Sequence, residues 1–139
     1  MTLTSSPTNP PNTGRRRSVL LIGLAPSAVD FSKVPGMDEA RLKAGLKAGL
    51  EEVVAAGYDA TWCLTDRTWE SAEKEISARL AEKRYDAIMI GAGLRTIPEH
   101  FLLFEQVINL VHAAAPGAKL CFNTSPDSTL AALRRWLEP

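Results

Sequence analysis

The most constraining feature of this sequence is the alternation of short apolar runs with segments of helical periodicity. The apolar runs lie at 18–23, 58–64, 86–90 and 119–123, and helical patterns follow at about 38–56, 69–84, 96–115 and from 125 onward. Such alternation is typical of parallel strands joined by crossover helices. The sequence therefore predicts an α/β fold.

The composition of each run predicts its place in the sheet. The runs at 18–23 and 86–90 are continuously apolar, as central strands covered on both faces are. The run at 58–64 alternates apolar and polar residues, which indicates an edge strand. Right-handed crossovers then favour a three-layer αβα sandwich with a four-stranded parallel sheet in the flavodoxin-like order 2-1-3-4. The alternative order 1-2-3-4 would place the alternating strand inside the sheet.

The amino-terminal segment differs from the rest of the chain. Residues 1–16 are rich in Ser, Thr, Pro and Asn, so we expect a disordered tail followed by a single domain over 17–139. The arginines 15–17 and the apolar run after them could instead begin a secretion signal. Cys63 and Cys121 lack the spacing of a zinc site or disulfide framework, so we expect a reducing, cytoplasmic location and no metal site.

The charge balance limits the classes of partner. Lys and Arg together number 16, as do Asp and Glu, so the chain lacks the basic surplus typical of proteins that bind nucleic acid. No apolar run approaches the length needed to span a bilayer. We therefore expect neither a nucleic-acid partner nor a membrane partner.

A ligand site is expected beyond the carboxyl ends of the first and third strands, where the strand order reverses. The loop at 23–36 is longer than most connections of this kind, which is typical of a binding loop. Gly91 and Gly93 after the third strand permit positive φ angles and close approach of a ligand to the backbone. The predicted ligand-binding residues are Ser27, Asp30, Gly91, Gly93, Arg95, Thr96, Asn123 and Thr124.

Two residues of this region have competing interpretations. We expect Arg95 directly before a helix opened by a capping box from Thr96 to Glu99, where an arginine and free N–H groups would form an anion site. Alternatively, Arg95 is an exposed side chain paired with Glu99 or another carboxylate. His100, in the first turn of that helix, is either a catalytic acid or base or a packed histidine under the loop.

The familiar cofactor and nucleophile motifs are missing from the sequence. The pair Gly91-x-Gly93 lacks the third glycine of a dinucleotide loop and follows the third strand rather than the first. Ser27 and Ser125 do not lie in a Gly-x-Ser-x-Gly elbow, and Ser125 is better explained as a helix N-cap. We therefore predict no cofactor.

The layout resembles that of the response-regulator receiver domain. However, Gly91 stands where that family has its phosphoacceptor aspartate, and Gly23 and Leu24 stand where it has an acidic pair, so phosphorelay is not expected. The stretches 90–95, 98–109 and 121–126 resemble a family of short flavodoxin-like or Rossmann-like α/β proteins to which no activity is assigned. This resemblance spans about residues 18–137 and implies the fold without a function.

Two functional hypotheses follow. The first is a small-molecule-binding domain for an anionic metabolite, and the sequence leaves open whether it is also an enzyme. The second is a non-catalytic, oligomeric interaction module with a vestigial cleft. A homodimer is expected because the segment 101–111 carries more apolar residues than a four-stranded sheet can bury.

Overall fold

A computed structural model describes residues 15–139 of the chain. Its strands are β1 (Ser18–Leu24), β2 (Asp59–Thr65), β3 (Ala87–Ile90) and β4 (Lys119–Phe122). The α-helices are α1 (Glu39–Ala55), α2 (Trp69–Glu82), α3 (Ala92–Arg95), α4 (Phe101–Ala114) and α5 (Thr129–Arg134). Four 3₁₀ turns connect them, namely η1 (Pro26–Ala28), η2 (Phe31–Lys33), η3 (Pro98–His100) and η4 (Pro126–Ser128).

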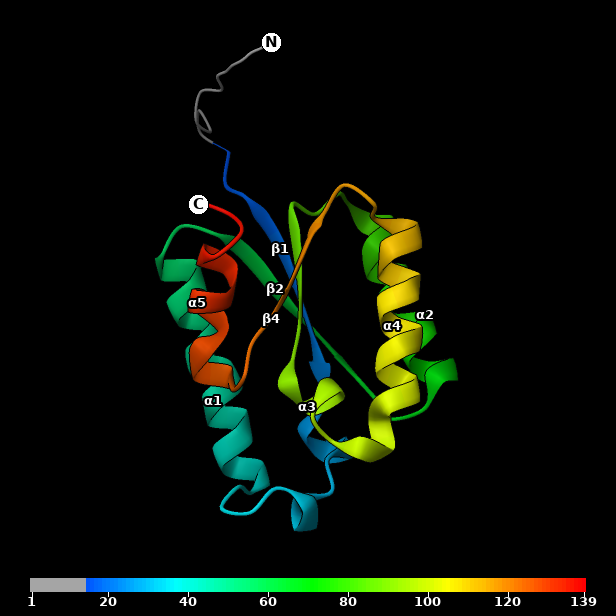
Figure 1. The fold of residues 1–139 in the computed structure, drawn as a ribbon. Helices are drawn as coiled ribbons and strands as arrows, with labels where there is room; N and C mark the ends of the chain where they lie inside the picture. The colour runs from blue at the N-terminus through cyan, green and yellow to red at the C-terminus, as the bar shows by residue number, and fades with distance from the viewer. Residues whose placement is uncertain (1–14) are drawn as a thin grey trace.

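The sheet is parallel throughout and has the order β2-β1-β3-β4, so the predicted order 2-1-3-4 is confirmed. Helices α1 and α5 cover one face of the sheet, and α2 and α4 cover the other, as Figure 1 shows. The three-layer sandwich expected from the sequence is therefore confirmed. The turns at the carboxyl ends of the strands, including α3, gather at the lower end of the view in Figure 1.

The two central strands supply both halves of the core. Leu20 and Ile22 of β1 point toward α2 and α4, whereas Val19 and Leu21 point toward α1 and α5, and all four are fully buried. Successive side chains of β3 also point to opposite faces of the sheet, with Ile88 and Ile90 on one side and Ala87 and Met89 on the other. Burial on both faces explains why these strands read as continuous apolar runs.

Strand β2 is an edge strand, as its alternating sequence predicts. Its residues are mostly half-buried, and only Cys63 and Thr65 are fully enclosed. The indole N–H of Trp62 donates a hydrogen bond to the backbone carbonyl of Leu46 at 3.1 Å. This bond ties the edge of the sheet to α1.

The helix predicted at 96–115 begins later in the structure, so its predicted start is wrong. Helix α4 begins at Phe101, and the four-residue α3 lies before it. The Thr96 hydroxyl donates to the backbone carbonyl of Ala92 at 2.8 Å, so it does not cap the following helix. Pro98 explains the break, because the residue before a proline is disfavoured in the α region.

The predicted tail lies almost entirely outside the described residues. Arg15 and Arg16, its last two residues, are described and exposed. The apolar run that follows them forms β1, the strand between β2 and β3, as the α/β interpretation requires. None of the helices at 15–139 is both long enough and apolar enough to cross a membrane.

Candidate functional site

Three segments meet at the carboxyl end of the sheet and enclose a cleft of about 330 Å³. They are the connection from β1 to α1, the region of α3 and η3, and the turn between β4 and η4. This is the edge at which ligands bind in open parallel sheets. The walls are mainly apolar, and their apolar residues include Val29, Phe31, Val34, Met37, Ile97 and Pro98.

A smaller space of about 80 Å³ adjoins the cleft. It reaches toward the sheet as far as Gly23, Trp62 and Gly91. Several residues line both spaces, among them Val29, Leu42, Ala92, Gly93 and Pro126. The cleft therefore has a wide outer part and a narrow apolar extension between α1 and the ends of the central strands.

The long connection after β1 is ordered by polar contacts within it. The Asp30 carboxylate accepts hydrogen bonds from the Ser32 backbone N–H at 3.1 Å and from the Ser32 hydroxyl at 2.6 Å. These bonds hold the pKa of Asp30 below its ordinary value. Asp30 thus caps η2 and fixes the loop that forms one wall of the cleft.

An ion pair joins this loop to the opposite wall. Lys33 Nζ lies 2.6 Å from Glu99 Oε2, so the β1–α1 connection is tied to η3. The pair lowers the pKa of Glu99 and raises that of Lys33. Glu99 pairs with Lys33 and does not form a capping box with Thr96, so the capping role predicted for it is wrong. Sequence reasoning also missed Lys33 as a residue of the cleft, because nothing local shows that two loops 66 residues apart meet.

Asn123 lines the inner extension of the cleft and connects the elements around it. Its side chain is buried, with its Oδ1 accepting from the Ala92 backbone N–H at 2.9 Å and its Nδ2 donating to the Thr129 hydroxyl at 3.1 Å. These bonds connect β4, α3 and α5. The site residue predicted at the end of β4 is thus also a structural link between three elements.

Arg95 lies in the last turn of α3 and not before a helix N-terminus, so its predicted position is wrong. Its guanidinium donates to the backbone carbonyl of Asn123 and lies over the Phe122 ring, 5.7 Å from the ring centroid. Arg95 does not appear among the residues that line the cleft within 15–139. An anion-binding role for Arg95 stays a prediction, but its contacts in the structure are with the protein.

These contacts predict a stability effect for Arg95. We expect Arg95→Ala to lower the free energy of unfolding by about 1.5–3 kcal/mol, because the Asn123 carbonyl loses a charged hydrogen-bond donor. Urea denaturation measures the change. Arg67→Ala, which removes an exposed arginine of the β2–α2 connection, is the control and should stay within about 0.5 kcal/mol of the wild type. A stable Arg95→Ala variant would contradict this structural role.

His100 is buried, with only 8% of its surface exposed, and its Nδ1 lies 3.3 Å from the Gly93 carbonyl oxygen. It does not contribute to the lining of the cleft in the described part of the chain. These contacts favour the packed interpretation of the histidine. A catalytic role for His100 stays a prediction.

Some of the remaining predicted site residues line the cleft, and others do not. Gly93, Thr96 and Thr124 line the cleft, and Gly91 lines its inner extension. Ser27 is exposed in η1, and Asp30 acts as the cap of η2. Gly91 and Gly93 do not use the positive φ angles that glycine permits, since in residues 15–139 only Gly36 and Gly57 adopt them. Gly91 instead allows close packing, since a Cβ there would lie 3.3 Å from the Ile22 carbonyl oxygen.

The described residues show no group of three or more His, Cys, Asp or Glu side chains that could hold a metal ion. Comparison with known proteins found no family model, no curated protein and no solved structure that matches this chain. Function resides in the site and is not implied by the fold.

Proposed function

We propose that this chain is a small-molecule-binding protein whose ligand occupies the cleft at the carboxyl end of the sheet. The cleft formed by three separate connections is the observation that carries this proposal. Its volume of about 330 Å³ lies within the range of small-molecule sites, which are mostly apolar with a few polar groups.

The lining indicates the chemistry of the ligand. An apolar body would pack against Phe31, Met37 and Ile97. Thr96, Thr124 and Ser125 add hydroxyl groups to the lining, and Lys33, although it is paired with Glu99, keeps further N–H donors for an anion. The proposed ligand is therefore an amphipathic, anionic metabolite. This retains the anionic class expected from the sequence but assigns the charge to Lys33 in place of Arg95.

Filling the cleft tests the proposal. The dye 8-anilinonaphthalene-1-sulfonate, which has an aromatic body and one negative charge, is a suitable probe. We expect saturable binding to the wild type and a loss of about tenfold or more in affinity for Gly93→Phe, a change of about 1.4 kcal/mol or more. The Cβ of a residue at position 93 would lie 3.8 Å from the Leu24 Cβ, which is an ordinary contact. Because Gly93 lines both the cleft and its inner extension, we expect a larger side chain there to occupy part of this space.

The control is Ala78→Phe, which places the same side chain at an exposed position of α2 that does not line the cleft or its inner extension. It should bind the dye as the wild type does. Circular dichroism would verify that both variants fold. Equal binding by folded Gly93→Phe and wild-type protein would overturn the proposal.

Self-association is the second candidate function. Phe101 and Leu102 at the start of α4 are 65% and 61% exposed, and β4 pairs with only one strand in the described chain. Exposed apolar side chains and an unpaired strand edge favour contact with a second copy. The homodimer and the flavodoxin-like family resemblance both stay proposals.

A further inference from the structure

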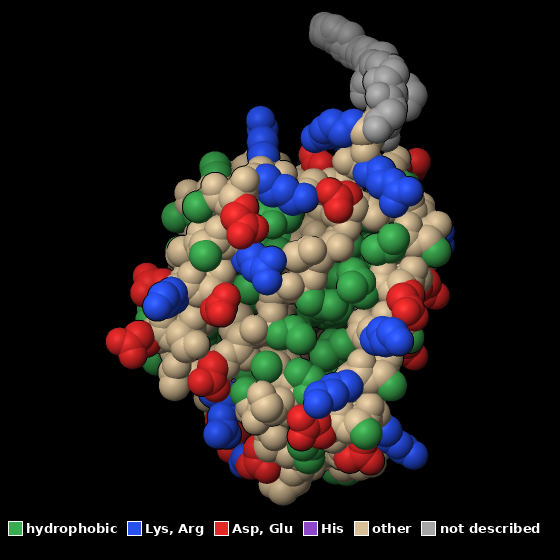
Figure 2. Space-filling view, turned by 180° about the vertical axis from the view of Figure 1, so that it is seen from behind, with side chains coloured by type: hydrophobic (Ala, Val, Ile, Leu, Met, Phe, Trp, Pro, Cys, Tyr) green, Lys and Arg blue, Asp and Glu red, His purple; other side chains and the backbone are tan. Residues whose placement is uncertain are grey.

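A second pocket, separate from the proposed ligand cleft, lies at the amino end of the sheet. It has a volume of about 480 Å³ and is lined by Arg15, Arg16, Ser18, Asp59, Lys83 and Arg84. Four of these residues are cationic and one is acidic. Figure 2 shows Lys and Arg side chains gathered at the end of the molecule where the first described residues enter, with some acidic side chains among them.

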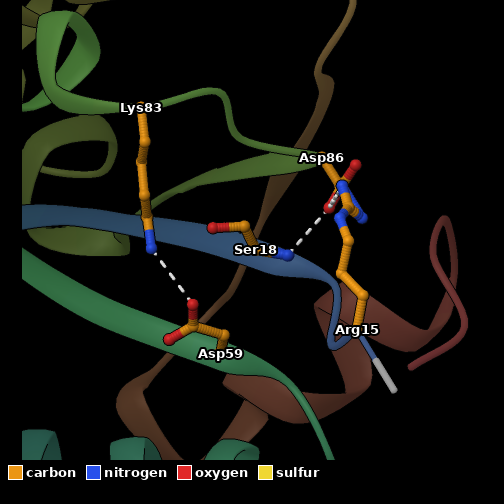
Figure 3. Close-up of polar contacts among 5 residues, drawn as sticks. All are labelled: Arg15, Ser18, Asp59, Lys83 and Asp86. Atoms are coloured by element: carbon orange, nitrogen blue, oxygen red, sulfur yellow. Dashed lines mark hydrogen bonds and ion pairs between the residues drawn. The ribbon is translucent and has the colours of Figure 1, made fainter. Parts of the chain in front are cut away.

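Ser18 gives this pocket an unsatisfied hydrogen-bond donor. The residue is only 8% exposed, and its hydroxyl has no hydrogen-bond partner in the described structure. Its backbone N–H donates to Asp86 at 2.8 Å, whereas Figure 3 shows its hydroxyl pointing toward the side on which Lys83 and Asp59 lie. A buried hydroxyl without a partner is costly, so such a group in a native structure needs an explanation.

The nearby acidic groups neutralise only part of the positive charge of this pocket. Lys83 Nζ lies 3.0 Å from Asp59 and keeps further N–H donors, because an ammonium group has three. Asp86 is held by Arg15 at 3.6 Å and by the Ser18 backbone. Within residues 15–139, Arg16 and Arg84 have no ion-pair partner. The pocket therefore retains donors and positive charge for an anion.

The end of α2 accounts for only part of this arrangement. Cations are favoured near a helix C-terminus, and Lys83 and Arg84 directly follow α2. That effect does not explain why cations from the start of the chain meet them, nor why the Ser18 hydroxyl is buried against them without a partner. An oxyanion in the pocket would explain both.

We propose that the pocket at the amino end of the sheet binds a phosphate group, either as free phosphate or as a small phosphate monoester. The Ser18 hydroxyl is enclosed in the structure, so neighbouring side chains must shift for it to donate to one phosphate oxygen. Lys83 and Arg84 supply charged donors to the others. Arginine suits this role because its planar guanidinium matches phosphate geometry. A neighbouring pocket of about 400 Å³ shares Lys83 and Arg84 and includes Tyr85, so it offers space for the organic part of a monoester.

Calorimetric titration of the full chain with inorganic phosphate at constant ionic strength tests this site. We expect saturable binding that is about tenfold weaker in Ser18→Ala and in Arg84→Gln, since each loses a hydrogen bond to a charged group. Lys47→Gln removes an exposed cation of α1, outside the pocket, and should bind as the wild type does. A heat signal that sodium chloride reproduces, or equal binding by Ser18→Ala, would overturn the proposal.

Thermal unfolding separates loss of binding from loss of folding. Because the Ser18 hydroxyl has no partner in the structure, Ser18→Ala should melt no lower than the wild type in phosphate-free buffer. At the same phosphate concentration, the melting temperature of the wild type should rise more than that of Ser18→Ala. A variant that melts lower without phosphate and still responds to phosphate as the wild type does would contradict the assignment.

Titration with phenyl phosphate distinguishes the two sources of the anion. Tighter binding than inorganic phosphate would indicate a monoester whose organic group enters the pocket beside Tyr85. Equal affinity would indicate free phosphate. Failure of both probes to bind would overturn the site without affecting the proposal for the carboxyl-end cleft.

Discussion

Raising the pH from about 8 to about 11 should lower the free energy of unfolding by about 2–3 kcal/mol for each of the two cysteines. Cys63 and Cys121 are 1% and 0% exposed, and burial raises the pKa of each thiol from 9.0 to about 11. Between these two values the thiols of the unfolded chain lose their protons while those of the folded chain keep them. The unfolded state is then favoured, so the stabilisation present below pH 9.0 is lost as the pH approaches 11.

The measurement is urea denaturation at several pH values in the presence of a reducing agent. The double variant Cys63→Ala/Cys121→Ala is the control, and its stability should fall less steeply over the same range. A residual fall is expected because burial also raises the pKa values of Tyr58 and Tyr85 above 10.0. Equal losses in the wild type and the double variant would contradict the assignment to the thiols.

Gly49→Ala should destabilise the protein by about 2 kcal/mol, even though alanine is the better helix former. A Cβ at position 49 would lie 2.8 Å from the backbone carbonyl oxygen of Pro126, closer than real Cβ contacts allow. Helix α1 or η4 would have to move, because the obstacle is a backbone atom. Pro126 also lines the proposed ligand cleft, so the shift should reach that cleft.

Gly45→Ala provides the matched control, one helical turn away on α1. A Cβ there would lie 3.4 Å from the Pro126 Cβ, which is an ordinary contact. That variant should gain up to about 1 kcal/mol from helix propensity. The two variants should therefore differ by about 3 kcal/mol in urea denaturation. Equal stability would show that α1 and η4 do not pack as closely as the structure indicates.

The layered fold could be predicted because the pattern that identifies each strand is local. The run at 86–90 is apolar at every position after Asp86, and it forms β3 between β1 and β4. The run at 58–64 alternates apolar and polar residues, and it forms β2, an edge strand of the sheet. A strand that is buried on both faces is apolar at nearly every position, whereas a strand that is buried on one face alternates apolar and polar residues. Strand order could therefore be inferred without any long-range contact.

The details of the site could not be predicted because they depend on contacts between distant segments. Thr96 and Glu99 fit a capping box locally, but Thr96 bonds back to Ala92 and Glu99 pairs with Lys33. Arg95 bonds to a carbonyl 28 residues away. One local signal was available, since Pro98 argues against a helix that continues from Thr96. The location of the cleft followed from topology, whereas the partners of its charged residues did not.

The most direct test of the proposed ligand cleft is a titration of isotope-labelled protein with 8-anilinonaphthalene-1-sulfonate, followed by two-dimensional ¹H–¹⁵N spectra. We expect saturable shifts at the backbone amides of Lys33, Gly93, Thr96 and Thr124, which come from three separate connections around one cleft. Shifts confined to Phe101 and Leu102, the exposed apolar residues of α4, would place the dye on the surface and contradict the cleft as the binding site.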